Sequence, residues 1–363
     1  MRWYLIAAVL LGGCYDDPIQ ISPYELTTAS EELERRQRER DEPIPERCGN
    51  GEVDSGEQCD DGNRIDNDEC SNHCIERRVS KSLEARPVVD AVAGSRRFDR
   101  DERGRVVLAP FQPIRLSGRD SVVTDGTLTA YEWSLDPEHG ASVPSGSQVF
   151  FDDEMKDRPR LMYSVRGEDR PGVDVLGTYT VALRVQGSDG SWSAFATVAF
   201  EAKANRALWI ELTWDRDDHD VDLHLIRTAD RNLAFDPLQD CYFSNCIPPS
   251  PGRSTLNWGS SAAGDDPFLD VDDVDGLGPE VISIPSPEDG MSYLIALHMF
   301  RLDFGPGTTV SLKVLVDGEV VSEMSREMGS HNDWWEALKV TWGEEVDVEV
   351  LDEYFNDAPN GFP

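Results

Sequence analysis

Four cysteines within 27 residues restrict the fold of this chain more than any other feature of its sequence. Cys48, Cys59, Cys70 and Cys74 follow the spacing C-x10-C-x10-C-x3-C, with many Gly, Asp and Asn residues between them. A segment this short cannot bury a useful apolar core, so cross-links must stabilise it. Two disulfides are expected, and four cysteines allow three pairings. A zinc site made by all four is the alternative, although only Cys70 and Cys74 have the spacing of a zinc-binding pair.

The remaining cysteines indicate the compartment. Cys241 and Cys246 form a close pair that we expect to close a tight disulfide loop, with a redox centre as the weaker alternative. If Cys14 is set aside, the chain has an even six cysteines. An even set at these spacings favours disulfides in an oxidising compartment.

The N-terminus has the pattern of a targeting signal. Residues 1–13 place one arginine before an apolar run from Trp3 to Leu11. This run is about half the length of roughly 20 residues that a membrane-spanning helix needs, so it predicts a signal peptide. Cys14 follows this run and suggests a lipid anchor, described below. The alternative is an ordinary signal peptide that a cysteine follows by chance.

The residues after the apolar run resemble the bacterial lipobox, in Leu11-Gly12-Gly13-Cys14. That resemblance implies a lipid on Cys14 that anchors the protein in a membrane. Tyr15 follows Cys14, and enteric lipoproteins retained at the inner membrane have an aspartate there, so the outer membrane or cell surface is expected. Residues 14–47 are polar and contain four prolines, which predicts a flexible tether.

The net charge limits the kinds of molecule that this protein is expected to bind. The chain has 34 Lys and Arg against 70 Asp and Glu, a formal charge of −36. Such a surface repels phosphate backbones, which argues against nucleic-acid binding. Most of the acids are expected to keep an exposed protein soluble, and two clusters are candidates for binding a cation.

Two longer regions, 84–203 and 206–343, consist of short alternating apolar and polar segments. Alternation of this kind predicts two consecutive antiparallel β-sandwiches, so the fold class is mostly β. Asp317-Gly318 predicts a hairpin with a type I′ turn. Residues 344–363 are acidic and are expected to form a disordered tail. The positions expected to share one face of a strand are Tyr179, Val181, Leu183 and Val185; Leu208, Ile210, Leu212 and Trp214; and Tyr293, Ile295, Leu297 and Met299.

Three regions resemble known families. Residues 48–76, with CGNG, GEQCDDGN and a final DEC in place of the usual DGC, resemble the Myxococcus cysteine-rich repeat of myxobacterial surface proteins. Residues 84–203 resemble a PKD-type immunoglobulin-like domain, which implies that Trp133 lies between the sheets and that the domain is a spacer or a protein or polysaccharide contact. Residues 206–343, with LTWDxxxxDVDLHL and LDVDDVDGLGPE, resemble a YfaP-type β-sandwich and the prepeptidase C-terminal domains of secreted proteases.

Acidic residues crowd two places in the second sandwich. Like charges this close repel unless they are hydrated, protonated or bridged by a cation, and calcium suits oxygen ligands. We therefore predict a calcium site, with a solvated acidic loop as the alternative. A weaker candidate lies in the cysteine-rich module, where the alternative is that Asp side chains bond their own backbone in turns. The predicted ligands are Asp215, Asp220, Asp222, Asp270, Asp272, Asp273, Asp275 and Glu280, and in the weaker site Asp60, Asp61, Asp66 and Asp68.

Catalytic chemistry has little support in the sequence. His219 and His224 lie five residues apart, and on a strand such residues face opposite sides, so no zinc site is expected from them. No metalloprotease, nucleophile-elbow or P-loop motif is present. Six aromatic residues either belong to the core or line a sugar or peptide surface: Tyr242, Phe243, Trp258, Trp334, Trp335 and Trp342.

These features together predict a non-catalytic, lipid-anchored surface protein. Its expected role is adhesion, binding or scaffolding towards an extracellular protein or polysaccharide. The alternative is an accessory or hydrolytic component of an extracellular degradation system.

Overall fold

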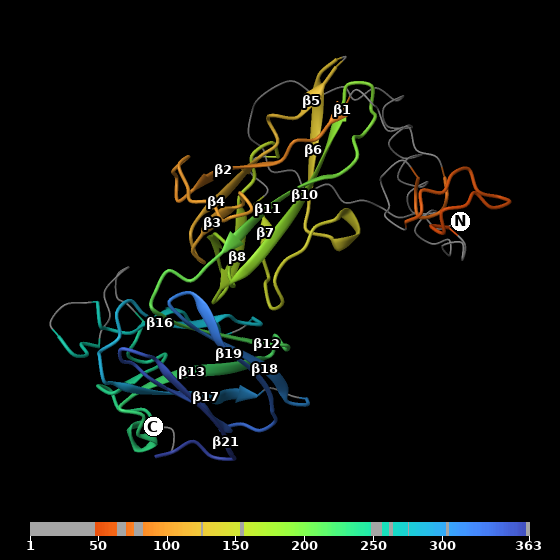
Figure 1. Ribbon diagram of the computed structural model, residues 1–363. Helices are drawn as coiled ribbons and strands as arrows, with labels where there is room; N and C mark the ends of the chain where they lie inside the picture. Colours follow the sequence, from red (N-terminus) through yellow and green to blue (C-terminus); the bar gives the residue numbers. More distant parts are fainter. Residues whose placement is uncertain are drawn as a thin grey trace, which may run out of the picture. The chain divides into compact units, whose positions relative to one another are not determined.

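A computed structural model describes nine ranges of the chain, which form two compact units (Figure 1). The first unit contains 48–63 and 70–75. The second contains 83–124, 126–152, 156–247, 256–260, 264–274, 276–302 and 305–360. The predicted signal peptide, Cys14 and the tether lie outside the described residues, as do Asp66, Asp68 and Asp275. Within the described ranges, no helix has the length and apolar character needed to cross a bilayer.

The first unit is held together by two disulfides. Cys48 pairs with Cys74 and Cys59 with Cys70, at Cα–Cα distances of 5.6 and 5.8 Å. The buried apolar cluster of this unit consists of cysteines alone. The expectation of a module cross-linked by two disulfides is therefore met, with Cys48–Cys74 and Cys59–Cys70 as the pairing.

The second unit is built almost entirely from short antiparallel strands, as the fold class predicted. Its N-terminal part packs a four-stranded sheet, β3-β11-β10-β6, against smaller sheets. The four strands are β3 (Val106–Leu108), β11 (Ala196–Ala202), β10 (Gly177–Gly187) and β6 (Leu128–Ser134). The smaller sheets contain β1 (Leu83–Glu84), β2 (Val88–Val92), β4 (Ile114–Ser117), β5 (Val122–Val123), β7 (Phe150–Phe151), β8 (Leu161–Val165) and β9 (Glu168–Pro171), and a 3-10 turn, η1, spans Pro137–His139.

The predicted inward face of β10 is buried. Tyr179 and Val181 lie in the main apolar cluster of this region, while Leu183 and Val185 lie in a smaller cluster with Leu83. Trp133 packs against both clusters but is only half-buried, and its Nε1 donates to the carbonyl of Lys156 at 2.8 Å. It therefore lies at the border of the two apolar clusters rather than in the centre of one.

The C-terminal part is a sandwich of two five-stranded sheets, ordered β15-β16-β12-β18-β19 and β14-β13-β17-β20-β21. The first sheet contains β12 (Leu208–Trp214), β15 (Phe268–Val271), β16 (Glu280–Ile284), β18 (Thr308–Val316) and β19 (Glu319–Met328). The second contains β13 (His219–Arg227), β14 (Asp240–Cys241), β17 (Ser292–Leu302), β20 (Trp334–Thr341) and β21 (Asp347–Phe355), and a 3-10 turn, η2, spans Arg231–Leu233.

The sequence pattern predicted the inner core of this sandwich correctly. All eight positions expected to face inward on β12 and β17 are buried in one apolar cluster. The β18–β19 turn has positive φ at both central residues, 49° at Asp317 and 82° at Gly318, as a type I′ turn requires.

A second apolar group covers the outer face of the β13–β17–β20 sheet. Ile226, Leu294, Ala296 and Trp334 project from the strands, and Ala234, Phe235, Tyr242 and Ala358 from outside the strands pack on them. We call these eight residues the outer layer. The Cys241–Cys246 disulfide closes the loop that carries Tyr242, as predicted from the spacing. Because of this cover, β13 is buried on both faces.

The prediction of a disordered tail from residue 344 is wrong for its central part. Asp347–Phe355 forms β21, which pairs antiparallel with β20 at the edge of the sheet. The physical reason is that apolar residues are interspersed with the acidic residues of this segment. Val348 and Tyr354 pack against the core, while Asp347 and Glu349 are exposed along the edge.

Candidate metal centre

Three predicted ligands meet at one end of β13. Asp220 and Asp222 lie on the strand, and Glu280 begins β16 of the other sheet. One oxygen from each lies within 4.8 Å of the others. The three residues are 1%, 2% and 0% exposed, respectively. Three carboxyl groups are therefore gathered where water scarcely reaches.

The open edge of β13 explains the position of Glu280. β14 pairs with β13 only at Leu225 and Ile226, so the backbone N–H of Leu223 has no partner on β14. That N–H donates to Glu280 Oε2 at 2.7 Å. The other oxygen of Glu280, Oε1, has no hydrogen-bond partner among the described residues, and neither has Asp220 Oδ1.

Burial and mutual repulsion make ionisation of this group costly. Burial, and then the neighbouring charge of Asp222, raise the pKa of Asp220 to about 7. Burial also raises the pKa of Glu280 well above its ordinary value, and the charges of Asp222 and Asp220 add to that effect. Without a cation, Asp220 and Glu280 therefore bind protons more readily than exposed carboxyl groups do.

Two further predicted ligands lie beside this group. Asp273 is 1% exposed, and its Oδ2 accepts from the backbone N–H of Gly278 at 3.0 Å. Its charge contributes to the raised pKa of both Asp220 and Glu280. Asp272 instead forms an ion pair with Arg166. Asp273 is therefore a neighbour that could support a cation, whereas Asp272 already has a counter-charge.

Asp215 and Asp270, also predicted as calcium ligands, have hydrogen-bond partners outside this group. Asp215 Oδ1 accepts from the Thr308 hydroxyl and from the N–H of Thr309, each at 2.8 Å. Asp270 accepts from the Ser283 hydroxyl at 2.5 Å, and burial raises its pKa to about 6. Each has satisfied its carboxylate locally, which acid density in the sequence could not reveal.

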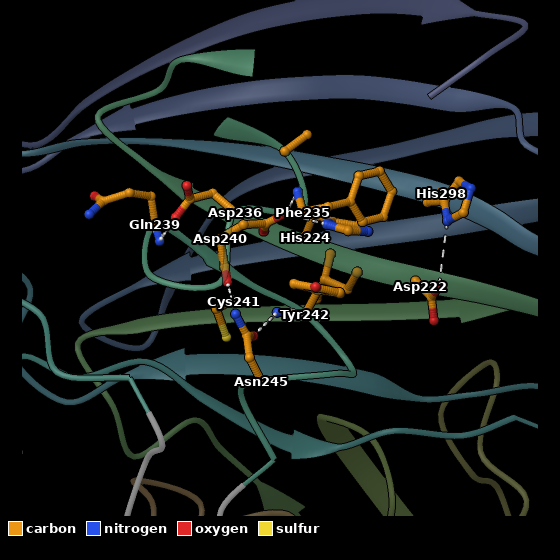
Figure 2. Close-up of polar contacts among 12 residues, drawn as sticks. Asp222, His224, Phe235, Asp236, Gln239, Asp240, Cys241, Tyr242, Asn245 and His298 are labelled. Carbon is orange, nitrogen blue, oxygen red and sulfur yellow. Dashed lines mark hydrogen bonds and ion pairs between the residues drawn. The ribbon is translucent and has the colours of Figure 1, made fainter. Parts of the chain in front are cut away.

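A second group, which shares Asp222, contains two histidines. Asp222, His224 and His298 each offer one ligand atom, all within 4.8 Å of one another. Figure 2 shows the dashed contact between Asp222 and His298, which joins Oδ2 to Nδ1 at 3.5 Å. His224 Nδ1 lies 2.7 Å from Asp240 Oδ2. All three members are at most 2% exposed.

The sequence reasoning missed His298 and considered His219 in its place. His219 Nε2 lies 3.0 Å from the carbonyl oxygen of Pro306, away from this group. The expectation that His219 and His224 do not converge therefore agrees with their positions. The signal that could have found His298 is the match between DLH on β13 and ALH on β17, two buried strands that are neighbours in the sheet.

Of the four acids predicted in the cysteine-rich module, Asp60 and Asp61 are described, and both accept backbone N–H groups in turns. Asp60 accepts from the backbone N–H groups of Gly49, Asn50, Gly51 and Gly62 at 2.8 to 3.1 Å. Asp61 accepts from the N–H of Asn63 at 3.2 Å. These bonds occupy the carboxylates within the module.

Comparison with known proteins adds no relative to this picture: no family model, no curated protein and no solved structure matches the chain. The functional argument therefore rests on the geometry of the chain itself.

Proposed function

We propose that this protein is a non-catalytic, lipid-anchored surface protein, acting in adhesion, binding or scaffolding, whose C-terminal sandwich is stabilised by calcium. The observation that carries the calcium part is the meeting of Asp220, Asp222 and Glu280 within 4.8 Å in a buried position. Buried charges are retained in proteins when they are paired or coordinate a metal.

The ligand chemistry favours calcium among the common cations. Calcium takes six to eight oxygen ligands in flexible geometry, whereas magnesium demands a near-ideal octahedron and keeps several waters. Asp220, Asp222, Glu280 and the neighbouring Asp273 are all carboxylates, and Glu280 Oε1 and Asp220 Oδ1 lack a hydrogen-bond donor among the described residues. A divalent ion would supply the positive charge that these oxygens lack.

Burial supports a structural role for this ion over a catalytic one. A metal that acts on an outside substrate needs an open coordination position that the substrate can reach. Asp220, Asp222 and Glu280 are at most 2% exposed. An ion among them would join β13 of one sheet to β16 of the other and so stabilise the sandwich.

The calcium proposal is tested by melting the purified protein in EDTA and in calcium. Calcium at about 100 times its dissociation constant should add about 2.7 kcal/mol to the free energy of unfolding. Asp222→Asn and Glu280→Gln should lose this calcium-dependent gain. Asp270→Asn is the matched control, since Asp270 is buried in the same sandwich but bonds Ser283, and it should keep the gain.

The comparison in EDTA and calcium needs no variant, so a folding defect cannot obscure it. Equal melting of the wild-type protein in both solutions, with no calcium in its native mass spectrum, would refute the calcium site.

The anchor is tested separately. Cys14→Ala should release the protein from the membrane fraction into the soluble fraction. The wild-type and variant proteins are compared by detergent partitioning, and unchanged partitioning of the variant would count against lipid anchoring.

A further inference from the structure

We infer that Asp222, His224 and His298 form a zinc site. It lies beside the proposed calcium site of Asp220, Asp222 and Glu280, which we call the calcium cluster. This inference goes beyond the proposed function and does not depend on calcium being bound. It rests on three observations: the strand register that gathers the three side chains, the partners that orient both imidazole rings, and the burial of the group under the outer layer.

The register of β13 and β17 brings the three residues together. Asp222 is directly opposite His298 in the antiparallel pair, and His224 is opposite Ala296. Residues two apart on a strand share a face, and directly opposed side chains have Cβ atoms about 5 Å apart. Asp222 and His224 therefore lie on the same face as His298, and the centroids of the two imidazole rings are 6.1 Å apart.

The partner of His224 leaves one of its ring nitrogens available. Its Nδ1 lies 2.7 Å from Asp240 Oδ2, and a carboxylate can only accept, so Nδ1 carries the proton. The same Asp240 oxygen also accepts from the N–H of Phe235 at 2.7 Å, which fixes the carboxylate in place. Nε2 then presents a lone pair in the neutral ring. It has no hydrogen-bond partner among the described residues, and His224 is 0% exposed.

His298 is oriented in the same way from the other side. Its Nε2 lies 2.9 Å from Asn332 Oδ1. The amide of Asn332 is set by its own nitrogen, which donates to Asp357 Oδ1 at 3.2 Å, so the oxygen faces the ring. Nε2 must therefore donate, and Nδ1 is the nitrogen that presents a lone pair in the neutral ring. Nδ1 faces Asp222 Oδ2 at 3.5 Å.

Asp222, His224 and His298 thus each bring one ligand atom to a buried position within 4.8 Å of the others. Metal-binding histidines almost always donate their second nitrogen to a carboxylate or carbonyl, and Asp240 and Asn332 supply such acceptors here. In a tetrahedral zinc site with bonds of about 2.1 Å, neighbouring ligand atoms lie about 3.4 Å apart. The separation of 3.5 Å between Asp222 Oδ2 and His298 Nδ1 fits one edge of that tetrahedron.

The donor set selects zinc over calcium at this position. Imidazole nitrogen suits zinc and related transition metals, whereas calcium prefers oxygen alone. Aromatic rings surround His224: Tyr242 stacks on it at 5.2 Å between ring centroids, and Phe235 and Trp334 lie at 4.9 and 4.8 Å. These rings shield the site from bulk solvent, so a bound ion would exchange slowly.

The test measures metal in the purified full-length protein. After exposure to zinc and extensive dialysis, elemental analysis should find one zinc per chain. Cobalt loaded in its place should give the visible absorption of a tetrahedral site, and zinc should displace it. His224→Ala and His298→Gln should lose the retained zinc, and Asp240→Asn, which removes only the outer partner, should weaken zinc binding about 10- to 100-fold.

The calcium cluster supplies the control that keeps the two proposals distinct. Glu280→Gln should lose the calcium-dependent gain in stability but keep one zinc, whereas His298→Gln should do the reverse. Asp222→Asn should lose both. Zinc retained equally by the wild type and both histidine variants would overturn the site. No retained zinc in the wild-type protein would also overturn it.

Discussion

Two acid-rich regions of this molecule treat their carboxylates in opposite ways. In the cysteine-rich module, Asp60 accepts four backbone N–H groups and lies at a solvated position. In the C-terminal sandwich, Asp220 and Glu280 are buried, and each keeps an oxygen without a hydrogen-bond partner among the described residues. Both regions look alike in sequence, so the density of acids does not by itself identify a cation site.

The difference teaches what decides the role of a carboxylate. Glycine-rich turns expose consecutive N–H groups, and an Asp side chain there replaces the missing backbone partners. A strand commits most of its N–H groups to neighbouring strands, so a buried Asp or Glu beside it accepts few of them, as Glu280 accepts from Leu223, and its remaining oxygen needs a proton or a cation. Ionisation should therefore stabilise the first region and destabilise the second when no metal is bound.

The largest expected effect comes from removing the cross-link of the module. Cys48→Ser with Cys74→Ser opens a loop with a sequence separation of 26, and a disulfide over such a loop contributes about 3.5 kcal/mol. Among the described residues of the module, the buried apolar cluster consists of cysteines, so residues 48–63 and 70–75 should lose their protection from hydrogen exchange. The melting of the sandwiches should not change.

Removal of the Cys241–Cys246 disulfide, which lies in the C-terminal sandwich, is the control for that experiment. Cys241→Ser with Cys246→Ser opens a separation of only 5, which corresponds to about 2 kcal/mol. That loop is embedded in a packed sandwich, so exchange should rise locally without loss of the fold. Persistent protection in the Cys48/Cys74 variant would mean that the turn bonds of Asp60 alone hold the module.

The next effect is a pH dependence that follows from Asp270. Burial raises its folded pKa from 3.8 to about 6. A raised acid pKa means that the folded state binds more protons than the unfolded state between these values, so stability falls as pH rises through that window. The loss attributable to this one group is on the order of 3 kcal/mol. Asp270→Asn should remove that part of the slope.

The measurement is the free energy of unfolding in urea from pH 4 to pH 7, in EDTA. Asp220, whose pKa is raised to about 7, adds a slope of the same sign in both proteins. The informative quantity is therefore the difference between wild type and variant, which should grow in favour of Asp270→Asn as pH rises. Parallel curves would show that Asp270 ionises as easily in the folded state as in the unfolded state.

The strands of this fold were predictable where a local pattern determines burial. Every second residue of β12 and of the central part of β17 is a large apolar one, and these residues form the inner core as expected. The segment VDLHL of β13 also alternates, which ordinarily indicates one exposed face. Its outer face is buried because Phe235, Tyr242 and Ala358 cover it. That cover comes from residues outside the strand, two shortly after it and one near residue 360, and nothing within the strand indicates it.

The sequence predicted several residues of the candidate site, but it did not predict which of them lie together. Asp220, Asp222 and Glu280 were expected ligands, but Asp215 and Asp270 satisfy their carboxylates with threonine and serine hydroxyls. His298 joins the group only because the register sets it opposite Asp222. Register between strands about 75 residues apart depends on the packing of the whole sheet, so a single sequence does not reveal it.

The smallest expected effect concerns Asp60 in the cysteine-rich module, the region whose carboxylates accept backbone N–H groups. Its slight burial opposes ionisation, but the N–H groups of Gly62, Gly51, Gly49 and Asn50 together lower its pKa below 3.8. A lowered acid pKa gives stability that is present above pH 4 and is lost as pH falls through the folded pKa. This dependence has the opposite sign to that of Asp270.

Because the disulfides still hold the module, Asp60→Asn should loosen its turns without unfolding it. In an NMR titration of the wild type, the amide signals of Gly49, Gly51 and Gly62 should shift together at acid pH, and in Asp60→Asn this shared inflection should vanish. Asp61→Asn is the matched neighbour, since Asp61 accepts only from Asn63 among the bonds described, and it should keep the inflection. If the Asp60→Asn amides still titrate together, another acid organises these turns, and the contrast between the two regions would no longer rest on Asp60.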